Sequence, residues 1–524
     1  MPVWRGWAGF IAMSIGMFMA VLDIQIVASS LPEIQSALRI PLDRLGWVQT
    51  AYLSAEIVAI PLTGWITRAL SMRVAFVVCV LGFTASSLVC AAAGGFGWLV
   101  SARAVQGFFG GFLIPLVFSA VFLMFADGPA RLRATMIAGV MAMLAPTLGP
   151  TAGGFITDRY SWHWLFLINV PAGIAVALVV AWIVSVDRGR EPGSRGVDLA
   201  TAPLLAVFLA GLQVVLSEAP ARGWTSPTML LTMLLCLCAG AIAVRRCLTQ
   251  PIPLVHLSAF RRRNFVLGCA FSFVLGVGLY GATFLLPLFL GVVRNHDPFE
   301  IGLIMTVTGG AQLIAAPIAT LAERRTDPRL LTVCGYGLLA IGLIGNGFLR
   351  PADDFWGVAW QQAARGTAFM FCLLPTTALA LGALPTAEVP NASGLFNLMR
   401  NLGGAIGLAV IDTLIQQRVP MHIAAIVERL QVGDRRTAQF VGLPLDQFTG
   451  QAIGPVDQAT RDLVAPLVER AGLTLALNEA WLLLGGVILL SLIAAPFLSR
   501  QEITAAEGNS ITLSRVSTDE RASS

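Results

Sequence analysis

One acidic residue, Asp23, lies about midway along the first long apolar stretch of the chain, between Phe18 and Pro32. Insertion scales put an acid at the centre of a membrane helix at roughly +2.5 to +3.5 kcal/mol, so a buried acid of this kind is a candidate functional group. The alternative is an acid that only fixes helix packing through an ion pair. We interpret Asp23 as a candidate proton-binding residue.

Few other ionisable residues interrupt the apolar stretches, namely Glu56, Arg103, Arg365, Arg400 and Asp412. A buried arginine without a counter-charge is costly, so we expect Arg103 to pair with Asp23 or with Glu56. The sequence does not decide between the two acids, and a purely structural ion pair would satisfy the same pattern. Asp23, Glu56 and Arg103 form the predicted proton-coupling group. Asp412 lies nearer the end of its helix, where an acid can be interfacial.

Gln49, Tyr52 and Glu56 fall on one face of a helix, because residues three and four apart are neighbours there. This polar stripe predicts a cavity lining. Aromatic residues such as those in the wider set serve packing more often than ligand contact. The other residues that we assign to a substrate cavity are Gln25, Gln106, Phe109, Tyr280, Phe284, Arg365 and Asn397.

A stretch rich in proline and glycine follows in the fifth apolar segment. Each proline removes a hydrogen bond of the helix ladder, and glycines four apart permit close helix packing. We predict a conformational hinge formed by Pro146, Gly149, Pro150, Gly153 and Gly154.

The amino-acid composition restricts the class of protein to which this chain can belong. Of 524 residues, 56% are hydrophobic and only 12% are charged, whereas soluble domains carry about 25% charged residues. Every basic residue is an arginine, so a P-loop and a Schiff-base site are both excluded. The four histidines and eight cysteines form no metal motif, and we expect no metal, no cofactor and no nucleic-acid partner. The composition predicts an all-α polytopic membrane protein.

About 20 apolar residues are needed to span a bilayer, and windows of that length predict about fourteen helices. The loop arginines, including the cluster 261–263, favour one side of the membrane, which predicts that both termini are cytoplasmic. The predicted spans are 7–29, 44–66, 74–93, 98–124, 134–155, 164–185, 197–216, 226–246, 264–289, 299–321, 330–349, 355–382, 396–417 and 477–499.

A weak internal repeat divides these spans. Residues 60–68 resemble 316–324, and Gln106-Gly107 with Pro115 resembles Arg365-Gly366 with Pro375. We therefore predict an N-terminal six-helix bundle (1–190), an inserted helix pair (191–250) and a C-terminal six-helix bundle (251–500). The last bundle contains a long periplasmic loop at 419–475 with amphipathic helical pieces, either a docking surface or a connector. A disordered cytoplasmic tail is expected at 501–524.

Several motifs together resemble the major facilitator superfamily, and within it the fourteen-helix drug:proton antiporters of the EmrB/QacA type. The likeness covers nearly the whole chain and is strongest to EmrB-like inner-membrane pump subunits. Arg68 and Ser71 depart from the usual second-loop motif, which has an acid and a glycine there. The matching stretches are 21–27, 60–65, 103–107, 149–154, 156–173 and 397–404.

The resemblance implies a major facilitator fold with its substrate site between the two bundles. It implies proton-driven export of hydrophobic or aromatic toxic compounds across the bacterial inner membrane. It also implies a periplasmic adaptor protein and a TolC-type outer-membrane channel as partners, besides protons, small molecules and lipid. The alternatives are an exporter of one metabolite and, more remotely, a membrane enzyme acting on lipid. The lipid enzyme would need a catalytic cluster that the sequence does not show.

Overall fold

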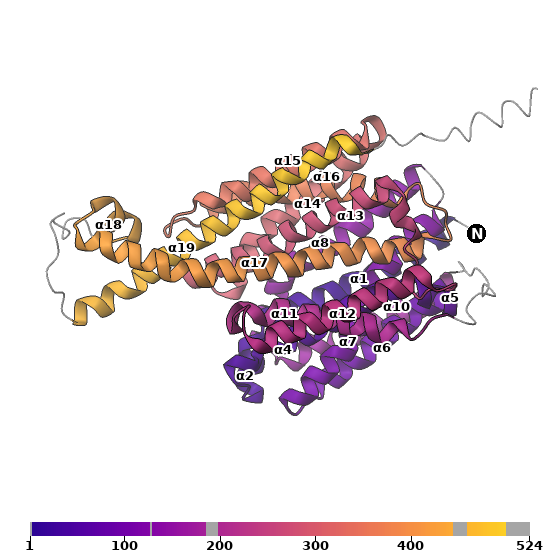
Figure 1. Cartoon of the computed structure of the whole chain (residues 1–524), viewed down its shortest axis with the longest axis horizontal. Coiled ribbons are helices and arrows are strands. Elements are labelled where there is room, and N and C mark those ends of the chain that lie inside the picture. The colour runs from indigo at the N-terminus through magenta and orange to yellow at the C-terminus, as the bar shows by residue number, and fades with distance from the viewer. Residues whose placement is uncertain (1–2, 126–127, 185–196, 444–457, 499–524) are drawn as a thin grey trace, which may run out of the picture.

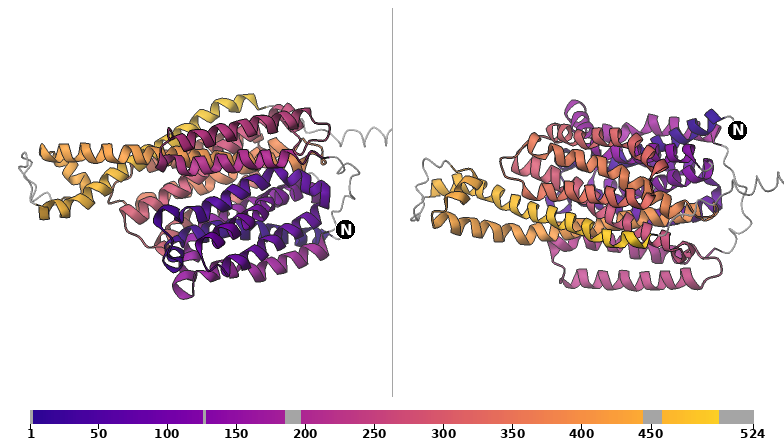
Figure 2. Two further views of the ribbon diagram at one scale, coloured as in Figure 1. Left: turned by 60° about the horizontal axis from the view of Figure 1, so that its bottom comes forward. Right: turned by 90° about the horizontal axis from the view of Figure 1, so that it is seen from above.

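The computed structural model describes residues 3–125, 128–184, 197–443 and 458–498. In these ranges, thirteen helical segments are long and apolar enough to cross a membrane. Figures 1 and 2 show these helices side by side in one elongated bundle, with a helical protrusion at one end. The predicted all-α polytopic fold is confirmed. The tail predicted at 501–524 lies outside the described residues.

The first half of the bundle holds Asp23, Glu56 and Arg103. Asp23 lies on α1, Glu56 on α4 and Arg103 on α7. Its elements are α1 (Val3–Ser29), the short α2 (Leu31–Leu38) and α3 (Leu42–Leu45), α4 (Trp47–Ala59), α5 (Thr63–Leu70), α6 (Met72–Ala91), α7 (Phe96–Met124), α8 (Pro129–Arg159), α9 (His163–Leu167) and α10 (Asn169–Ile183).

An inserted pair of helices separates the two halves in the sequence. In space, α11 packs against α12 and also against α4 and α17, so it covers one side of the interface between the halves. The pair is α11 (Thr201–Arg222) and α12 (Pro227–Thr249). The second half is α13 (Arg263–Leu288), α14 (Pro298–Arg325), α15 (Pro328–Gly345), α16 (Phe355–Leu381), α17 (Val389–Gln431), α18 (Arg435–Val441) and α19 (Gln458–Ser491).

The span predicted at 44–66 is one continuous path made of three helical pieces. A 3-10 turn at Ile60–Leu62 joins α4 to α5, and Pro61 lies inside that turn. Proline has no amide hydrogen, so the ladder of α4 cannot continue through it. The pieces are each too short to count as a membrane span, which explains why thirteen spans are found where about fourteen are predicted.

The segment predicted as a long loop at 419–475 is instead helical at both ends. α17 continues to Gln431, α18 follows, and α19 begins at Gln458. We call the part of α17 beyond residue 419, α18 and the first part of α19 the hairpin. Residues 444–457 lie outside the described part. The hairpin projects from the end of the bundle opposite the N-terminus (Figure 1).

A small core of its own stabilises the hairpin. Ile426 and Leu430 on α17 pack with Val441 on α18 and with Val468 and Ala471 on α19, and all five are buried. Arg418 forms an ion pair with Glu479 at 2.5 Å where the two long helices leave the bundle. The amphipathic pattern that we noted in this segment therefore serves helix-to-helix packing.

An ionic tie joins the beginnings of α14 and α16 at the hairpin end of the bundle. His296 lies 2.7 Å from Glu300 and 2.9 Å from Asp354, and Arg294 lies 2.8 Å from Asp354. Hydrogen bonding from Arg294 lowers the pKa of Asp354 to about 2. Partial burial lowers the pKa of His296, but its hydrogen bonds to Glu300 and Asp354 outweigh that effect and raise it.

This tie predicts a bell-shaped pH dependence of stability. The lowered pKa of Asp354 stabilises the fold above about pH 4 and loses that effect as pH falls through about 2. The raised pKa of His296 stabilises it below about pH 6.5, and this contribution is lost as pH rises further. We expect the Tm difference between the parent and His296→Gln to be largest near pH 5. A difference that grows toward pH 9 would contradict this account.

Candidate functional site

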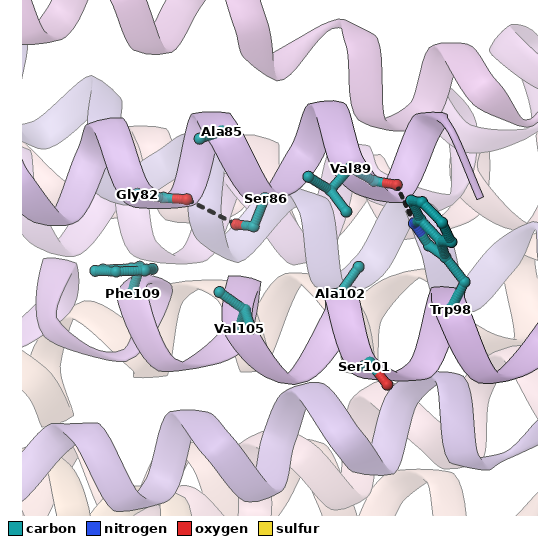
Figure 3. A pocket seen from close by; sticks show the side chains of 9 residues that line it. All are labelled: Gly82, Ala85, Ser86, Val89, Trp98, Ser101, Ala102, Val105 and Phe109. Atoms are coloured by element: carbon teal, nitrogen blue, oxygen red, sulfur yellow. Dashed lines mark hydrogen bonds between the residues drawn. The ribbon is translucent and has the colours of Figure 1, made fainter.

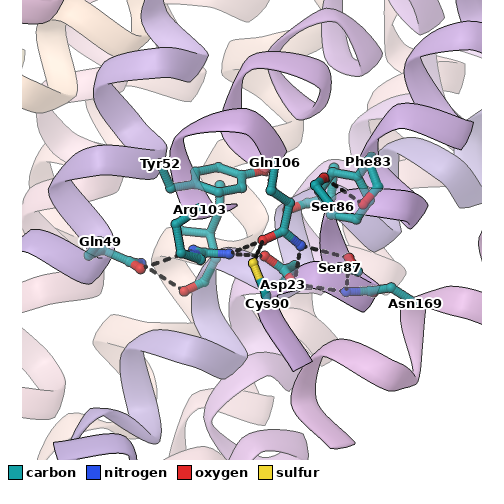
Figure 4. A network of polar contacts seen from close by, with 12 residues as sticks. Asp23, Gln49, Tyr52, Phe83, Ser86, Ser87, Cys90, Arg103, Gln106 and Asn169 are labelled. Carbon is teal, nitrogen blue, oxygen red and sulfur yellow. Dashed lines mark hydrogen bonds and ion pairs between the residues drawn. The ribbon is translucent and has the colours of Figure 1, made fainter. Parts of the chain in front are cut away.

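Asp23 and Arg103 form an ion pair inside the first half. Nη1 of Arg103 donates to Oδ2 of Asp23 at 2.5 Å, and neither side chain is exposed. The pairing that the sequence left open between Asp23 and Glu56 is therefore made with Asp23. Figure 4 shows this pair at the centre of a polar network drawn from α1, α4, α6, α7 and α10.

The second oxygen of Asp23 is also occupied. Its Oδ1 accepts from Nε2 of Gln106 at 3.1 Å and from Nδ2 of Asn169 at 2.8 Å. Ser87 accepts from both of those amides, at 2.8 Å from Gln106 and 3.4 Å from Asn169. A carboxylate held by three donors satisfies the requirement that buried charges be paired and hydrogen-bonded.

Arg103 has acceptors on its other side. Its Nε donates to the carbonyl oxygen of Val48 at 3.4 Å, and its Nη2 donates to Oε1 of Gln49 at 3.3 Å. The ring of Tyr52 lies 4.3 Å from the guanidinium carbon, within range of a cation–π interaction. Two members of the predicted polar stripe, Gln49 and Tyr52, thus hold Arg103, which holds Asp23 in turn.

Ser87 and Asn169 belong to the network, although the sequence analysis assigned neither to the site. Asn169 begins α10 directly after the tryptophan-rich turn, inside a stretch that carries the family resemblance. That stretch was a usable signal for Asn169. Ser87 is one of several small polar residues on α6, and nothing in the sequence distinguishes it.

Glu56, on the other hand, lies apart from the ion pair. It is 4% exposed and interacts electrostatically with Arg103 and with Arg400, which belongs to α17 of the second half. Neither arginine comes within ion-pair distance of it, and Arg400 donates to Oδ1 of Asn397. Glu56 is therefore an acid that faces the interface between the halves and has no ion-pair partner among the described residues.

Several predicted cavity residues have polar or packing contacts within or between helices. Tyr280 donates to Oδ1 of Asn401 at 2.9 Å, linking α13 to α17. Asn397 is 1% exposed and donates to the carbonyl oxygen of Ser393 within α17. Gln25 packs closely against Gly149 of α8. The predicted hinge residues all lie within α8, which is continuous from Pro129 to Arg159.

Phe109 and Phe284, which the sequence assigns to a substrate cavity, lie outside the central polar network. Phe109 lies against Gly82 in a groove of about 540 Å³ between α6 and α7 (Figure 3). Trp98 and Val105 line the same groove and are exposed, which is the pattern of a lipid-facing surface. Phe284 is 38% exposed on α13. The spacing of aromatic residues along a helix does not predict whether they face the protein interior or the lipid.

Arg365 lines a small enclosed cavity of about 40 Å³ between the halves. The cavity is bordered by α8 of the first half and by α13, α14, α15 and α16 of the second. Arg365 and Arg103 are both buried, but the surroundings of Arg365 include no ion pair within the described residues. The charge of Arg103 is therefore balanced by a carboxylate within the described residues, whereas the charge of Arg365 is not.

Comparisons with known proteins bear on this arrangement of helices and polar residues. The model of the Major Facilitator Superfamily matches residues 13–408. The chain belongs to the Major Facilitator Superfamily. It is 39% identical over 426 residues to the colistin resistance protein EmrB of Acinetobacter baumannii, covering 81% of this chain and 83% of that one. It is 29% identical to the multidrug export protein EmrB of Escherichia coli, covering 92% and 93%.

Solved structures agree on the fold of this EmrB-like member of the superfamily. The proton:xylose symporter XylE superposes with a TM-score of 0.60 at 12% identity, covering 95% of this chain and 97% of that one. The human organic anion transporter MFSD10 superposes with a TM-score of 0.57 at 14% identity, covering 94% and 100%. At such identities the likeness establishes only the fold, two six-helix bundles with an inserted pair in this chain.

A glycine fixes how closely this transporter's α7 approaches α4. A Cβ added to Gly107 would overlap the carbonyl oxygen of Tyr52. We expect Gly107→Ala to push the two helices apart and to lower the free energy of unfolding by about 1–3 kcal/mol, the usual cost of overpacking. Because Tyr52 supports Arg103, transport should fall as well.

Gly97 provides the matched control on the same helix, since a Cβ there meets nothing within 4 Å. Thermal unfolding in detergent should show a lower Tm for Gly107→Ala than for the parent protein, and an unchanged Tm for Gly97→Ala. Equal Tm values for the two variants would refute the close-approach argument.

Proposed function

We propose that this chain exports hydrophobic or aromatic toxic compounds across the bacterial inner membrane in exchange for protons. The observation that carries the proposal is the buried Asp23–Arg103 pair inside the first half of a transporter fold. Both EmrB relatives are named for resistance or multidrug export, which supports the export of toxic compounds. Proton flow supplies roughly 2.3 kcal/mol per charge for each 100 mV of membrane potential.

The proposed coupling follows from competition for one carboxylate. A proton that binds Asp23 competes with the Arg103 guanidinium, which lies 2.5 Å away. Since Asp23 is 1% exposed, the proton must reach it in another conformation of the bundle. Protonation there releases Arg103 from Asp23 and alters the contacts between α1, α4 and α7. Glu56, which faces the second half without an ion-pair partner, would share proton binding.

Efflux in cells tests the proposal. Strains that lack or carry the protein would be loaded with aromatic dyes, ethidium and rhodamine 6G among them, and dye loss followed with and without a proton gradient. We expect faster loss in carrying cells, abolished when the gradient is collapsed. Equal rates in both strains across the panel, or efflux that survives collapse of the gradient, would contradict the proposal.

We further propose that the hairpin docks a periplasmic adaptor protein that leads to a TolC-type outer-membrane channel. Two features support this. The loop arginines favour a cytoplasmic location for the end of the bundle that carries the N-terminus, and the hairpin lies at the other end (Figure 1). The hairpin also has its own buried core while it exposes Val432 and Leu463.

Photo-crosslinking in the native host tests this docking surface. A photoreactive residue at Val432 should give a crosslinked product that contains a membrane-anchored adaptor. The same residue at Trp4, exposed at the opposite end, should not. Crosslinks to the adaptor from Trp4 but not from Val432 would contradict the proposal, because they would place the N-terminal end of the bundle, and not the hairpin, in the periplasm.

A further inference from the structure

Arg365 is a buried cation with an unused donor. It is 7% exposed, and its Nη1 has no hydrogen-bond partner in the described part of the chain. It also takes part in no ion pair there. A buried charge without a partner is strongly unfavourable, whereas a paired and hydrogen-bonded one is not. The structure therefore leaves one donor of Arg365 available at a cavity that Arg365 itself lines.

The internal repeat shows what is missing beside Arg365. Gly107 of α7 packs on the Tyr52 carbonyl of α4, and Gly366 of α16 packs on the Thr308 carbonyl of α14 in the same way. Arg365 thus occupies in the second half the place that Gln106 occupies in the first.

In the first half, Gln106 meets the carboxylate of Asp23, which α1 supplies. The corresponding stretch of α13, around residues 278–280, carries no acid. Gly278 of that stretch lines the cavity with Arg365. The second half therefore has the arginine but lacks the carboxylate. The cavity is lined by α13, the helix that corresponds to α1, which supplies Asp23 in the first half.

The lining of the cavity fits a small acidic group on an apolar molecule. Besides Arg365, the polar residues Thr147, Thr283, Thr308 and Gln312 line the cavity, and the remaining lining residues are apolar. A volume of about 40 Å³ holds a few water-sized groups, so a carboxylate fits while a whole aromatic molecule does not. The apolar lining residues include Leu275, Leu279, Met305, Leu339 and Phe369.

We propose that Arg365 binds the carboxylate of a lipophilic organic acid, which takes the place that Asp23 holds in the first half. The guanidinium would donate Nη1 to the acid, a charge-assisted hydrogen bond of the kind that arginine forms with carboxylates. The apolar body of the acid would extend between α8 and α14 once the halves separate. This inference rests on the proposed export function and names one class of substrate for it.

Binding to the full-length protein in nanodiscs tests the inference without any gradient. The probes share one apolar body and differ in charge: 1-naphthoate, 1-naphthalenemethanol and 1-naphthylmethylammonium. Acetate supplies the acidic group alone. We expect 1-naphthoate to bind more tightly than the other three probes. Arg365→Gln should weaken 1-naphthoate about tenfold or more, because a charged hydrogen bond is lost. The alcohol should be unaffected, and Arg365→Lys should recover part of the affinity.

Arg418→Gln is the matched control, since Arg418 is ion-paired to Glu479 at the base of the hairpin. It should leave 1-naphthoate binding unchanged, and the Tm of each variant shows whether it folds. Equal binding of 1-naphthoate to the parent and to a folded Arg365→Gln variant would overturn the inference. So would tighter binding of the amine, binding of acetate as tight as that of 1-naphthoate, or no binding of any probe. Proton-driven dye efflux would still stand in each case, so the two proposals fail separately.

Discussion

Replacing Asp23 by asparagine is expected to abolish proton-driven efflux and to leave the protein folded in the membrane. Asparagine has the same shape, and its side-chain oxygen can still accept from Arg103, which keeps acceptors on Gln49, Gln106 and the Val48 carbonyl. The variant cannot bind and release a proton at this position. Dye uptake into everted vesicles, in which an exporter pumps inward, should fall to the rate of vesicles without the protein.

Glu56→Gln is the informative companion to Asp23→Asn. Glu56 has no ion-pair partner in the described structure, so its substitution removes a titratable group without breaking the buried network. If the two acids share proton binding, Glu56→Gln should reduce gradient-driven efflux and shift its pH profile. Full proton-driven efflux by Asp23→Asn, with loss only in Glu56→Gln, would assign the proton to Glu56 and make the Asp23–Arg103 pair structural.

Arg103→Met should destabilise the protein more than any other single substitution in this network. It keeps the apolar stem but leaves Asp23 without its counter-charge, at 0% side-chain exposure. Removing one partner of a buried ion pair costs about 3–5 kcal/mol. We expect this loss in the free energy of unfolding, measured by denaturant titration in detergent.

A double variant separates the ion pair from general packing. In Asp23→Asn with Arg103→Met both charges are gone, so the uncompensated carboxylate disappears. The double variant should unfold at a higher denaturant concentration than Arg103→Met alone. If the losses of the two single variants simply add, the two residues do not interact energetically and the pair is not what holds α1 to α7.

The fold was largely predictable because apolar stretches of about 20 residues leave few alternatives in a membrane. In the hairpin the sequence predicts only amphipathic helical pieces, because windows that measure hydrophobicity end where α17 and α19 leave the apolar region, although both helices continue. Similarly, Pro61 divides one predicted span into α4 and α5, which a hydrophobicity window does not register.

The sequence predicts which residues belong to the site better than it predicts which of them contact one another. A costly buried charge singles out Asp23 and Arg103 in the sequence, but helical spacing alone could not choose between Asp23 and Glu56 as the partner of Arg103. The position of Phe109 in the groove between α6 and α7 could not be predicted, because an aromatic residue on an apolar helix does not indicate which way it faces. The unused donor of Arg365 depends on the absence of any acidic residue from the lining of the cavity that four other helices form with it, which only the three-dimensional structure shows.

The most direct test is proton release by the purified protein. A compound that the efflux assay shows to be exported would be added to the detergent-solubilised protein in weak buffer, and pH followed with an indicator. We predict substrate-dependent proton release by the parent protein and none by Asp23→Asn at matched substrate occupancy. Equal proton release by both proteins, or binding to the parent with no release at any pH between 6 and 8, would contradict the assignment of Asp23 as the proton carrier.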